Sequence, residues 1–280
     1  MTTDTQQIRA ETILVTGGTG KTGRRVADRL KRRGLPVRVG SRSGEPPFDW
    51  ENRDTWKPAL QGVGAVYISF YPDLAFPGAA ETVGAFSRLA VQHGVRRLVL
   101  LSGRGEEGAQ VSEREVQNAG AEWTIVRANW FNQNFSEGFL VDPVLSGEIM
   151  LPAGDAVEPF VDAEDIADVA VAALTEEAHV GRIYELSGPR LLSFHDVAAE
   201  ISKASGREVR YVPVTKEEYT KILEENDLPV EFAELFTLIL DGRNASVTDG
   251  VRQALGREPR DFSDYAREAA TSGIWNDRPA

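Results

Sequence analysis

The feature that most constrains the fold is a glycine-rich segment between a short apolar run and an amphipathic one. Thr12–Thr16 is apolar and β-branched, as is typical of a buried parallel strand, and it leads directly into GGTGKTG at residues 17–23. Arg24–Arg33 then carries apolar residues at helical spacing and ends at Gly34. A strand, a tight glycine turn and a helix in this order predict a dinucleotide-binding site.

Each glycine of this turn has a predicted role. Gly17 permits the tight turn, Gly20 lets the backbone approach the pyrophosphate, and Gly23 lets the helix lie close to the strand. The N–H groups at the helix start would bind the phosphates. By their position in the turn, three more residues are expected at the cofactor: Thr19, Lys21 and Thr22. The alternative is a glycine-rich turn without a ligand.

Lys21 does not turn this segment into a P-loop. That motif has a glycine five positions before its Gly-Lys-Ser/Thr, and the corresponding residue here is Val15.

Strands and helices alternate from residue 12 to about residue 127, and glycines mark several of the joints. The pattern predicts an α/β fold, a Rossmann doubly wound parallel sheet. Strands are expected at Thr12–Thr16, Pro36–Gly40, Ala65–Phe70, Arg97–Leu101 and Trp123–Arg127, and helices at Arg24–Arg33, Ala79–His93 and about Val111–Ala119.

The alternation loosens after about residue 140. Leu145–Pro152 is expected to form a hairpin or a short extended piece, Asp162–Leu174 a helix and Arg182–Leu186 a strand. From Ser193 the chain is mostly helical, with one short strand at Glu208–Val212. We therefore expect a dinucleotide-binding domain at 11–188, of which 140–160 leans partly on its neighbour, and a smaller, mostly helical substrate domain at 189–280.

The end of the second expected strand indicates which cofactor is bound. An acidic residue there would bind the ribose 2′-hydroxyl, whereas a basic one accommodates a 2′-phosphate. The chain has Ser41, Arg42 and Ser43 at this point and no acid. A guanidinium binds phosphate through paired, charge-assisted hydrogen bonds, so Ser41 and Arg42 predict NADP(H). The alternative is that Arg42 is an ordinary surface arginine.

Composition excludes several other classes of function. The net charge of −12 argues against a broad nucleic-acid surface. The chain has no cysteine, and its three histidines are far apart, so no metal site is expected. No stretch approaches the ~20 apolar residues of a membrane span, and the polar start lacks a signal-peptide core. A cytoplasmic protein without a membrane or nucleic-acid partner is expected.

Several segments resemble the NmrA-like group of atypical short-chain dehydrogenases. They are ILVTGGTGKTG, the Ser-Arg after the second strand, FDWENRDTW, GVRRLVLLSG, WTIVRANWFNQNF, PFVDAEDIADVA and LGREPRDFSDYAREAA. The resemblance runs from about residue 12 to about residue 275. Within the group, the chain most resembles bacterial relatives of the ergot-alkaloid festuclavine dehydrogenases.

The resemblance implies roles for particular residues. Asp49 matches the position that meets the adenine, and Ser69, Phe70 and Tyr71 lie on a loop that skirts the cofactor. Arg127-Ala128-Asn129 matches a turn of the pattern Arg-Pro-x that lies beside the nicotinamide in the family. Ala128 stands where that pattern has proline.

Three aromatic residues would form walls of a pocket for a small, flat or aromatic substrate. The alternative for each of them is simple core packing. They are Trp130, Phe131 and Phe135, and Tyr71 is expected to line the same pocket.

The usual acid of short-chain dehydrogenases is missing. None of the six tyrosines has a lysine four residues on, and the segment Gly105–Gln117, where that pair should lie, has neither residue. One interpretation is a reductase of activated acceptors, namely iminium ions, quinones, enones or carbonyls, with Tyr71 or Ser102 as the proton source. The other is a non-catalytic, NADP-binding redox sensor of the NmrA type. Either a monomer or a homodimer is compatible with the sequence.

Overall fold

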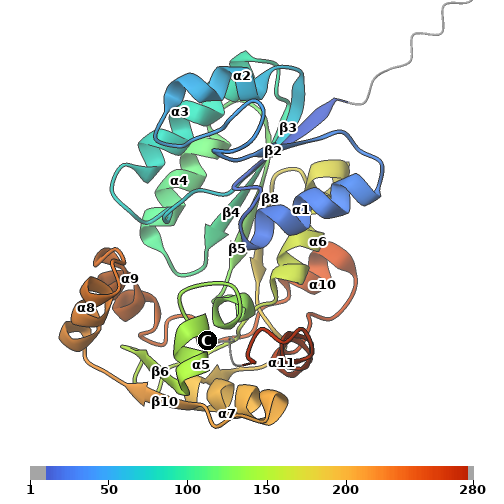
Figure 1. Cartoon of the computed structure of the whole chain (residues 1–280). Coiled ribbons are helices and arrows are strands. Elements are labelled where there is room, and N and C mark those ends of the chain that lie inside the picture. Colours follow the sequence, from blue (N-terminus) through green and yellow to red (C-terminus); the bar gives the residue numbers. More distant parts are fainter. Residues whose placement is uncertain (1–10, 277–280) are drawn as a thin grey trace, which may run out of the picture.

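A computed structural model describes residues 11–276 of the 280-residue chain. Six parallel strands form one sheet in the order β2-β1-β3-β4-β5-β8 (Figure 1). They are β1 (Thr12–Thr16), β2 (Val37–Gly40), β3 (Val63–Ile68), β4 (Arg97–Gly103), β5 (Glu122–Ala128) and β8 (Arg182–Leu186). The order reverses between β1 and β3, and ligands bind at such a switch point in doubly wound sheets. The predicted fold class is confirmed.

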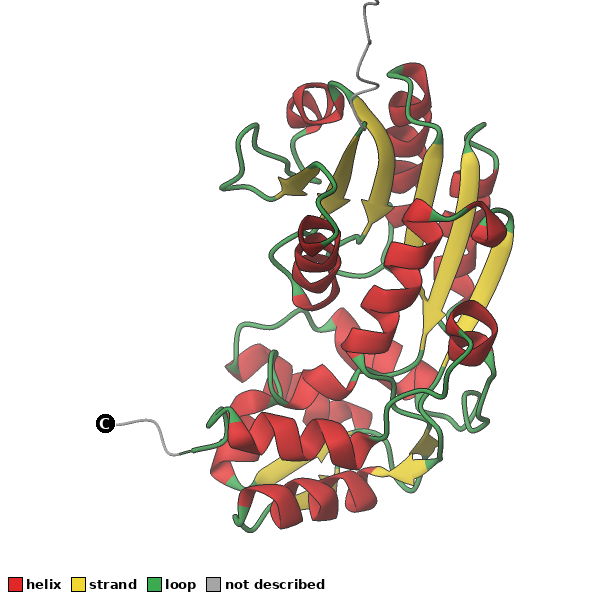
Figure 2. Ribbon diagram, turned by 90° about the vertical axis from the view of Figure 1, so that its right-hand side faces the viewer, coloured by secondary structure: helices red, strands yellow, loops and turns green. Residues whose placement is uncertain are grey.

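Helices cover both faces of this sheet (Figure 2) because alternate strand residues face opposite sides. Leu14 packs in one core and its neighbour Val15 in the other. The helices on the Leu14 side are α2 (Trp56–Leu60), α3 (Ala79–Gln92) and α4 (Glu107–Gln117), and those on the Val15 side are α1 (Lys21–Arg32), α6 (Ala163–Thr175) and α10 (Gly250–Leu255).

Ion pairs fix α1, which follows the glycine turn, against α6. The guanidinium of Arg25 is largely buried and donates to Glu164 at 2.5 Å and to Glu137 at 2.6 Å. Arg29 donates to Glu164 at 2.5 Å and to Asp168 at 2.6 Å. The helix that would hold the phosphates is therefore fixed from its buried side.

A smaller lobe lies below the carboxyl ends of the sheet strands, and its core is rich in aromatic rings (Figure 1). Its helices are α5 (Val141–Ser146), α7 (Phe194–Ser205), α8 (Lys216–Glu225), α9 (Glu231–Ile239) and α11 (Phe262–Thr271). Its short strands are β6 (Glu148–Leu151), paired in parallel with β10 (Arg210–Pro213), and β7 (Val157–Glu158), paired antiparallel with β9 (Leu192–Ser193). None of the helices within residues 11–276 is long and apolar enough to cross a membrane.

Of the two forms expected for Leu145–Pro152, the structure shows the short extended piece, β6, and not a hairpin. The partner of β6 is β10, which lies about 60 residues further along the chain. Local sequence cannot show such a long-range pairing.

The hydrophobic cores do not divide at residue 188, which is the boundary expected between the two domains. Side chains between Trp130 and Phe160 pack in one cluster with side chains from Leu192 to Trp275, whereas Val251 of α10 packs against the sheet. We therefore propose that residues 130–160 belong to the smaller lobe and that α10 belongs to the larger one.

Candidate active site

The glycine turn after β1 has the backbone geometry that a phosphate site requires. Gly17 has a φ of +59°, in the left-handed region that favours glycine, and a Cβ on Gly23 would lie 2.2 Å from the carbonyl oxygen of Gly17. Gly20 has a φ of −78° and is exposed. Among the described residues, a Cβ there would meet only the Gly17 oxygen, at 3.2 Å. Gly20 therefore keeps the outer side of the turn open.

The start of α1 suits an anion. Gly20 caps the helix without a side-chain hydrogen bond to the free N–H groups, and the first turn holds no acidic residue. These N–H groups lack intrahelical partners and carry partial positive charge. An open glycine turn joined to an uncapped helix start fits the pyrophosphate of a dinucleotide.

The side chains of the turn point in different directions. Thr19 is exposed, whereas Thr22 is buried and its Oγ1 accepts a hydrogen bond from the Tyr67 hydroxyl at 3.0 Å. Thr22 can therefore offer a phosphate only its backbone N–H. Lys21 lines the cavity described below, and burial lowers the pKa of its ammonium group although Glu137 nearby opposes the shift.

The loop after β2 holds the predicted ribose contacts. The carbonyl oxygen of Ser41 accepts hydrogen bonds from the N–H groups of Gly44 at 3.0 Å and Phe48 at 2.8 Å, which fold the loop back beside the strand. Arg42 is exposed on this loop, and within residues 11–276 no ion pair or hydrogen bond engages its guanidinium. Arg42 is therefore available to a 2′-phosphate.

The remaining predicted cofactor residues of the larger lobe lie close to one another. A Cβ on Gly17 would lie 3.2 Å from that of Ser69, so the loop after β3 touches the glycine turn. Trp50 donates its indole N–H to the Ser69 carbonyl at 3.1 Å and packs edge-on against Phe70. Asp49 precedes Trp50, and its carboxylate accepts the N–H of Glu51 at 3.1 Å.

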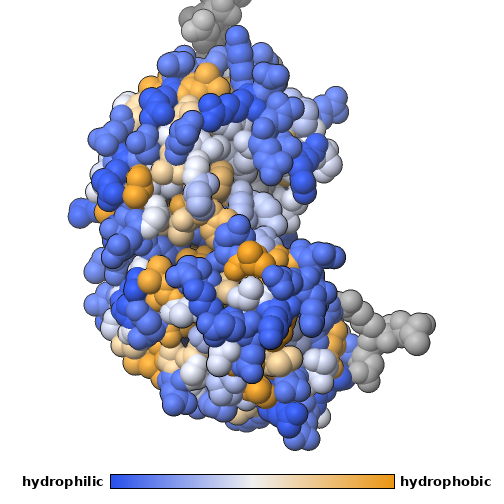
Figure 3. Space-filling model, turned by 90° about the vertical axis from the view of Figure 1, so that its left-hand side faces the viewer, coloured by the Kyte–Doolittle hydropathy of each residue, from blue (hydrophilic) through white to orange (hydrophobic). Residues whose placement is uncertain are grey.

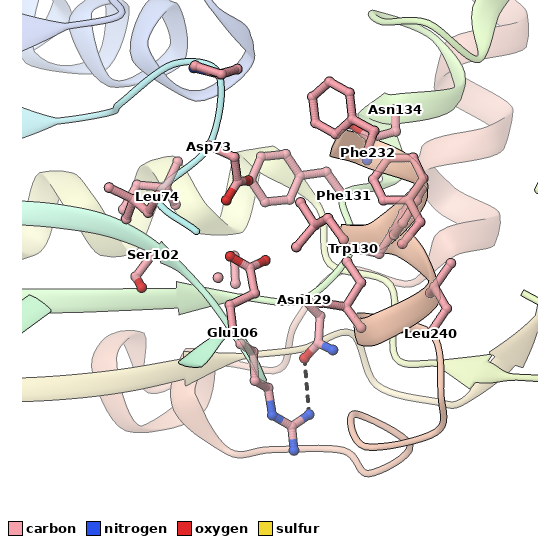
Figure 4. Close-up of a pocket in the computed structure, with 18 of the residues that line it drawn as sticks. Asp73, Leu74, Ser102, Glu106, Asn129, Trp130, Phe131, Asn134, Phe232 and Leu240 are labelled. Carbon is pink, nitrogen blue, oxygen red and sulfur yellow. Dashed lines mark hydrogen bonds between the residues drawn. The ribbon is translucent and has the colours of Figure 1, made fainter. Parts of the chain in front are cut away.

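A cavity of about 380 Å³ lies between the two lobes, beside the carboxyl ends of β4 and β5. Apolar side chains reach the surface where the lobes meet (Figure 3). Figure 4 shows residues from the loop after β3, from β4, from the segment that follows β5 and from α9 around one space. The cavity brings together most of the predicted nicotinamide and substrate residues: Phe70, Tyr71, Ser102, Asn129, Trp130 and Phe131.

The two predicted proton sources differ in environment. Tyr71 is 75% exposed at the edge of the cavity. Ser102 is buried, and its hydroxyl donates to Glu113 at 2.7 Å. Arg127 holds the same carboxylate with two hydrogen bonds of 2.8 and 2.7 Å. Because the Ser102 proton is already donated to a carboxylate, this hydroxyl is poorly placed to protonate a substrate.

The aromatic residues of the predicted wall divide between cavity and core. Trp130 and Phe131 line the cavity, and Trp130 packs against Phe236 of α9 at 4.8 Å between ring centroids. Phe135 does not line it: its ring is fully buried among Phe160, Phe194 and Phe262. The core-packing alternative therefore describes Phe135, because its 3₁₀ turn (Asn132–Phe135) points the ring into the smaller lobe.

Three carboxyl groups at the cavity were not expected from the sequence. Glu158 in β7 accepts a hydrogen bond from Asn129 at 3.0 Å through Oε2, whereas its Oε1 has no partner among the described residues. The amide oxygen of Asn129 accepts from Arg104 at 3.1 Å (dashed line in Figure 4). Asp73 and Glu106 face one another nearby. These acids come from three distant segments, although Glu106 directly precedes the helix in which Tyr and Lys are missing.

The Glu158 carboxyl should make stability depend on pH. Burial raises the pKa of Glu158 from 4.5 to about 7. Between these values the folded chain binds the proton more tightly than the unfolded chain does, so the free energy of unfolding should fall as pH rises through this window. Glu158→Gln should remove up to about 3 kcal/mol of that decline. Urea unfolding of the wild type and of Glu158→Gln at about pH 5 and about pH 8 gives the free energy of unfolding at each pH. An equal fall of this free energy in the two proteins would contradict a buried carboxyl at Glu158.

Comparison with known proteins identifies the family. The NmrA-like family model matches residues 108–266, and an NAD(P)H-binding model matches residues 17–177. Each match spans more than half of the 280 residues. The chain belongs to the NmrA-like family of NAD(P)H-binding proteins, as the sequence motifs predict.

Individual relatives agree with this assignment along nearly the whole chain. A festuclavine dehydrogenase from Aspergillus fumigatus is 31% identical over 290 residues, which cover 92% of this chain and 97% of the relative. An NAD(P)H azoreductase from Xenophilus azovorans is 31% identical over 288 residues, 93% of this chain and 98% of the relative. The solved NADPH complex of the Escherichia coli quinone oxidoreductase QOR2 superposes with a TM-score of 0.75 at 20% identity, over 91% of this chain and 99% of that one. The predicted class, an NAD(P)H-dependent oxidoreductase, is confirmed.

Proposed function

We propose that this protein is an NADPH-dependent reductase that transfers hydride to small, flat acceptors such as iminium ions, quinones, enones or activated carbonyls. The observation that carries the proposal is the aromatic-walled cavity where the cofactor lobe meets the C-terminal helices. A site without the Tyr–Lys pair suits acceptors that are already electrophilic, for which placing the reactants together supplies much of the acceleration. The relatives named as an alkaloid dehydrogenase, an azoreductase and a quinone oxidoreductase support this class.

Different residues of the larger lobe would bind different parts of the cofactor. The turn from Gly17 to Gly23 would bind the pyrophosphate, and Ser41 and Arg42 the 2′-phosphate. Bound NADPH supplies the hydride. Asn129 is fixed between Arg104 and Glu158, so it can present its amide to the nicotinamide side of the cavity in one orientation.

The residues of the smaller lobe would form the acceptor site. Trp130 offers a rigid apolar face, and Phe236 and Phe232 of α9 extend it, since Phe236 packs against Trp130 and Phe232 against Phe236. Flat rings are favoured by such walls because stacked or edge-on aromatic contacts add to the burial of apolar area. Phe131 lines the same space.

The alternative of a non-catalytic redox sensor is less favoured. A sensor needs an exposed docking surface and has no use for a substrate-sized cavity beside the nicotinamide. The cavity of about 380 Å³ is large enough for a small aromatic molecule.

The proposed activity is tested by following NADPH oxidation with a quinone, an enone, a cyclic iminium ion and an azo dye, with NADH in parallel. Turnover of at least one acceptor, faster with NADPH than with NADH, is expected. Tight NADPH binding with no turnover of any of the four would favour the redox sensor instead.

A further inference from the structure

Two carboxyl groups meet inside the cavity. Glu106 lies just before α4, and its side chain folds back over Gly103, where an added Cβ would lie 2.1 Å from the carboxyl carbon. Asp73 comes from the loop after β3 and points toward Glu106 (Figure 4). The two carboxyl groups line the same cavity and face each other there. Because two negative charges that share a poorly solvated site disfavour each other, one of the two carboxyl groups should keep its proton.

The surroundings place that proton on Glu106. Burial raises the pKa of Asp73 too, but Asp73 accepts the N–H of Ala75 at 2.8 Å, which favours its charged form. Glu106 is 92% buried and receives no such bond among the described contacts; burial and the charges of Asp73 and Glu113 raise its pKa well above the ordinary value. Glu106 is therefore the neutral acid and Asp73 its charged neighbour.

The other charged groups near this pair are already engaged. Glu113 of α4 is held by Arg127. Arg104, two residues before Glu106, contacts Glu185 at 3.4 Å and Ser246 at 2.7 Å. Arg243, from the loop before α10, donates to the Gly105 carbonyl and is paired with Asp241. Lys21 and Glu158 line other parts of the same cavity.

Resting on the proposed function, we propose that Glu106 is the catalytic proton donor for acceptors that must gain a proton, and that Asp73 is its positioning residue. Tyr71 lies in water and Ser102 gives its proton to Glu113. Glu158 also lines the cavity, but the amide of Asn129 donates to it and favours its charged form, so Glu106 is the cavity acid best placed to give a proton. Two residues that line the same cavity, Trp130 and Glu158, each have one buried polar atom without a partner among the described residues, Nε1 and Oε1 respectively.

For a quinone, the proposed proton transfer from Glu106 completes the reduction with atoms and electrons conserved. The quinone gains two electrons and a hydrogen as hydride from NADPH, and the oxygen that becomes negative takes the proton of Glu106. Hydroquinone and NADP⁺ leave, and water entering at the open edge returns a proton to the Glu106 carboxylate. An iminium ion needs the hydride alone, because it is neutralised to an amine without a proton.

This difference between acceptors gives the test. Glu106→Gln keeps an amide that can donate to Asp73 but carries no acidic proton. We expect the ratio of kcat/KM for a quinone to kcat/KM for an iminium ion to fall about 10- to 100-fold, in the range of a lost general acid that water partly replaces. Glu107→Gln, an exposed neighbour on the same helix, should leave the ratio unchanged.

Asp73→Asn tests the positioning role. Without the neighbouring negative charge, Glu106 loses its proton at lower pH. The alkaline limb of the pH profile for the quinone should therefore move to lower pH, whereas the profile for the iminium ion should not move with it. An unshifted quinone profile would contradict the role of Asp73.

A measurement without cofactor or acceptor tests the proton itself. Infrared difference spectra between the wild type and Glu106→Gln at neutral pH should show the C=O stretch of one protonated carboxyl in the wild type only. Absence of that band, or an unchanged quinone-to-iminium ratio, would overturn the assignment of Glu106 while leaving the reductase proposal intact. A wild type that turns over neither acceptor would overturn the reductase and, with it, the donor role.

Discussion

Gly20→Val is expected to lose binding of both NADPH and NADH while the protein stays folded. Gly20 has an extended φ of −78° that any residue can adopt, and its outer side is open, so the fold should accept a side chain there. The two methyl groups of valine would instead occupy the space through which the pyrophosphate reaches the N–H groups of α1. We expect affinity to fall by at least about 100-fold, or about 2.7 kcal/mol, by fluorescence titration.

Two further variants separate loss of binding from loss of folding. Gly20→Ala should weaken binding less than valine does, because it adds one carbon instead of three. Gly23→Ala should instead lower the free energy of unfolding, since its Cβ would lie 2.2 Å from the Gly17 oxygen. Retained affinity in folded Gly20→Val would contradict the assigned site.

The cofactor half of the molecule could be predicted from the sequence because its determinants are local. A strand, a glycine turn and a helix follow one another in the chain, and the continuous apolar run of the strand indicates that both of its faces are buried. Ser41 and Arg42 could be placed for the same reason, since they follow a strand end. Helix and strand ends differ from the expectations by a few residues, where capping geometry decides.

The substrate half could be predicted only in part because it is assembled from distant segments. Asp73, Glu106 and Glu158 follow or lie on different strands and meet only in the folded chain. Searching the helix after β4 for Tyr and Lys could not reveal Glu106, whose acidity depends on burial and on Asp73. Phe135 shows the complementary difficulty: a run of aromatic residues does not tell which ring faces a cavity and which faces a core.

Arg42→Ala is expected to weaken NADPH binding far more than NADH binding. The two cofactors differ by the 2′-phosphate, and Arg42 is an exposed guanidinium on the loop after β2 with no partner among residues 11–276. Charge-assisted hydrogen bonds contribute about 1.5–3 kcal/mol each, so NADPH affinity should fall by about 10- to 100-fold. The affinity for NADH should change by less than about threefold, since it makes no phosphate contact there.

The control must remove the same charge elsewhere, because the chain carries a net charge of −12 that repels any anionic cofactor. Arg32→Ala does this from the exposed last turn of α1, away from the glycine turn at its start. A general electrostatic effect would weaken NADPH binding to a similar extent in both variants and would shrink with added salt. A loss specific to Arg42 and to the 2′-phosphate would therefore identify a bound phosphate group, whereas equal losses for NADPH and NADH would contradict the assigned role.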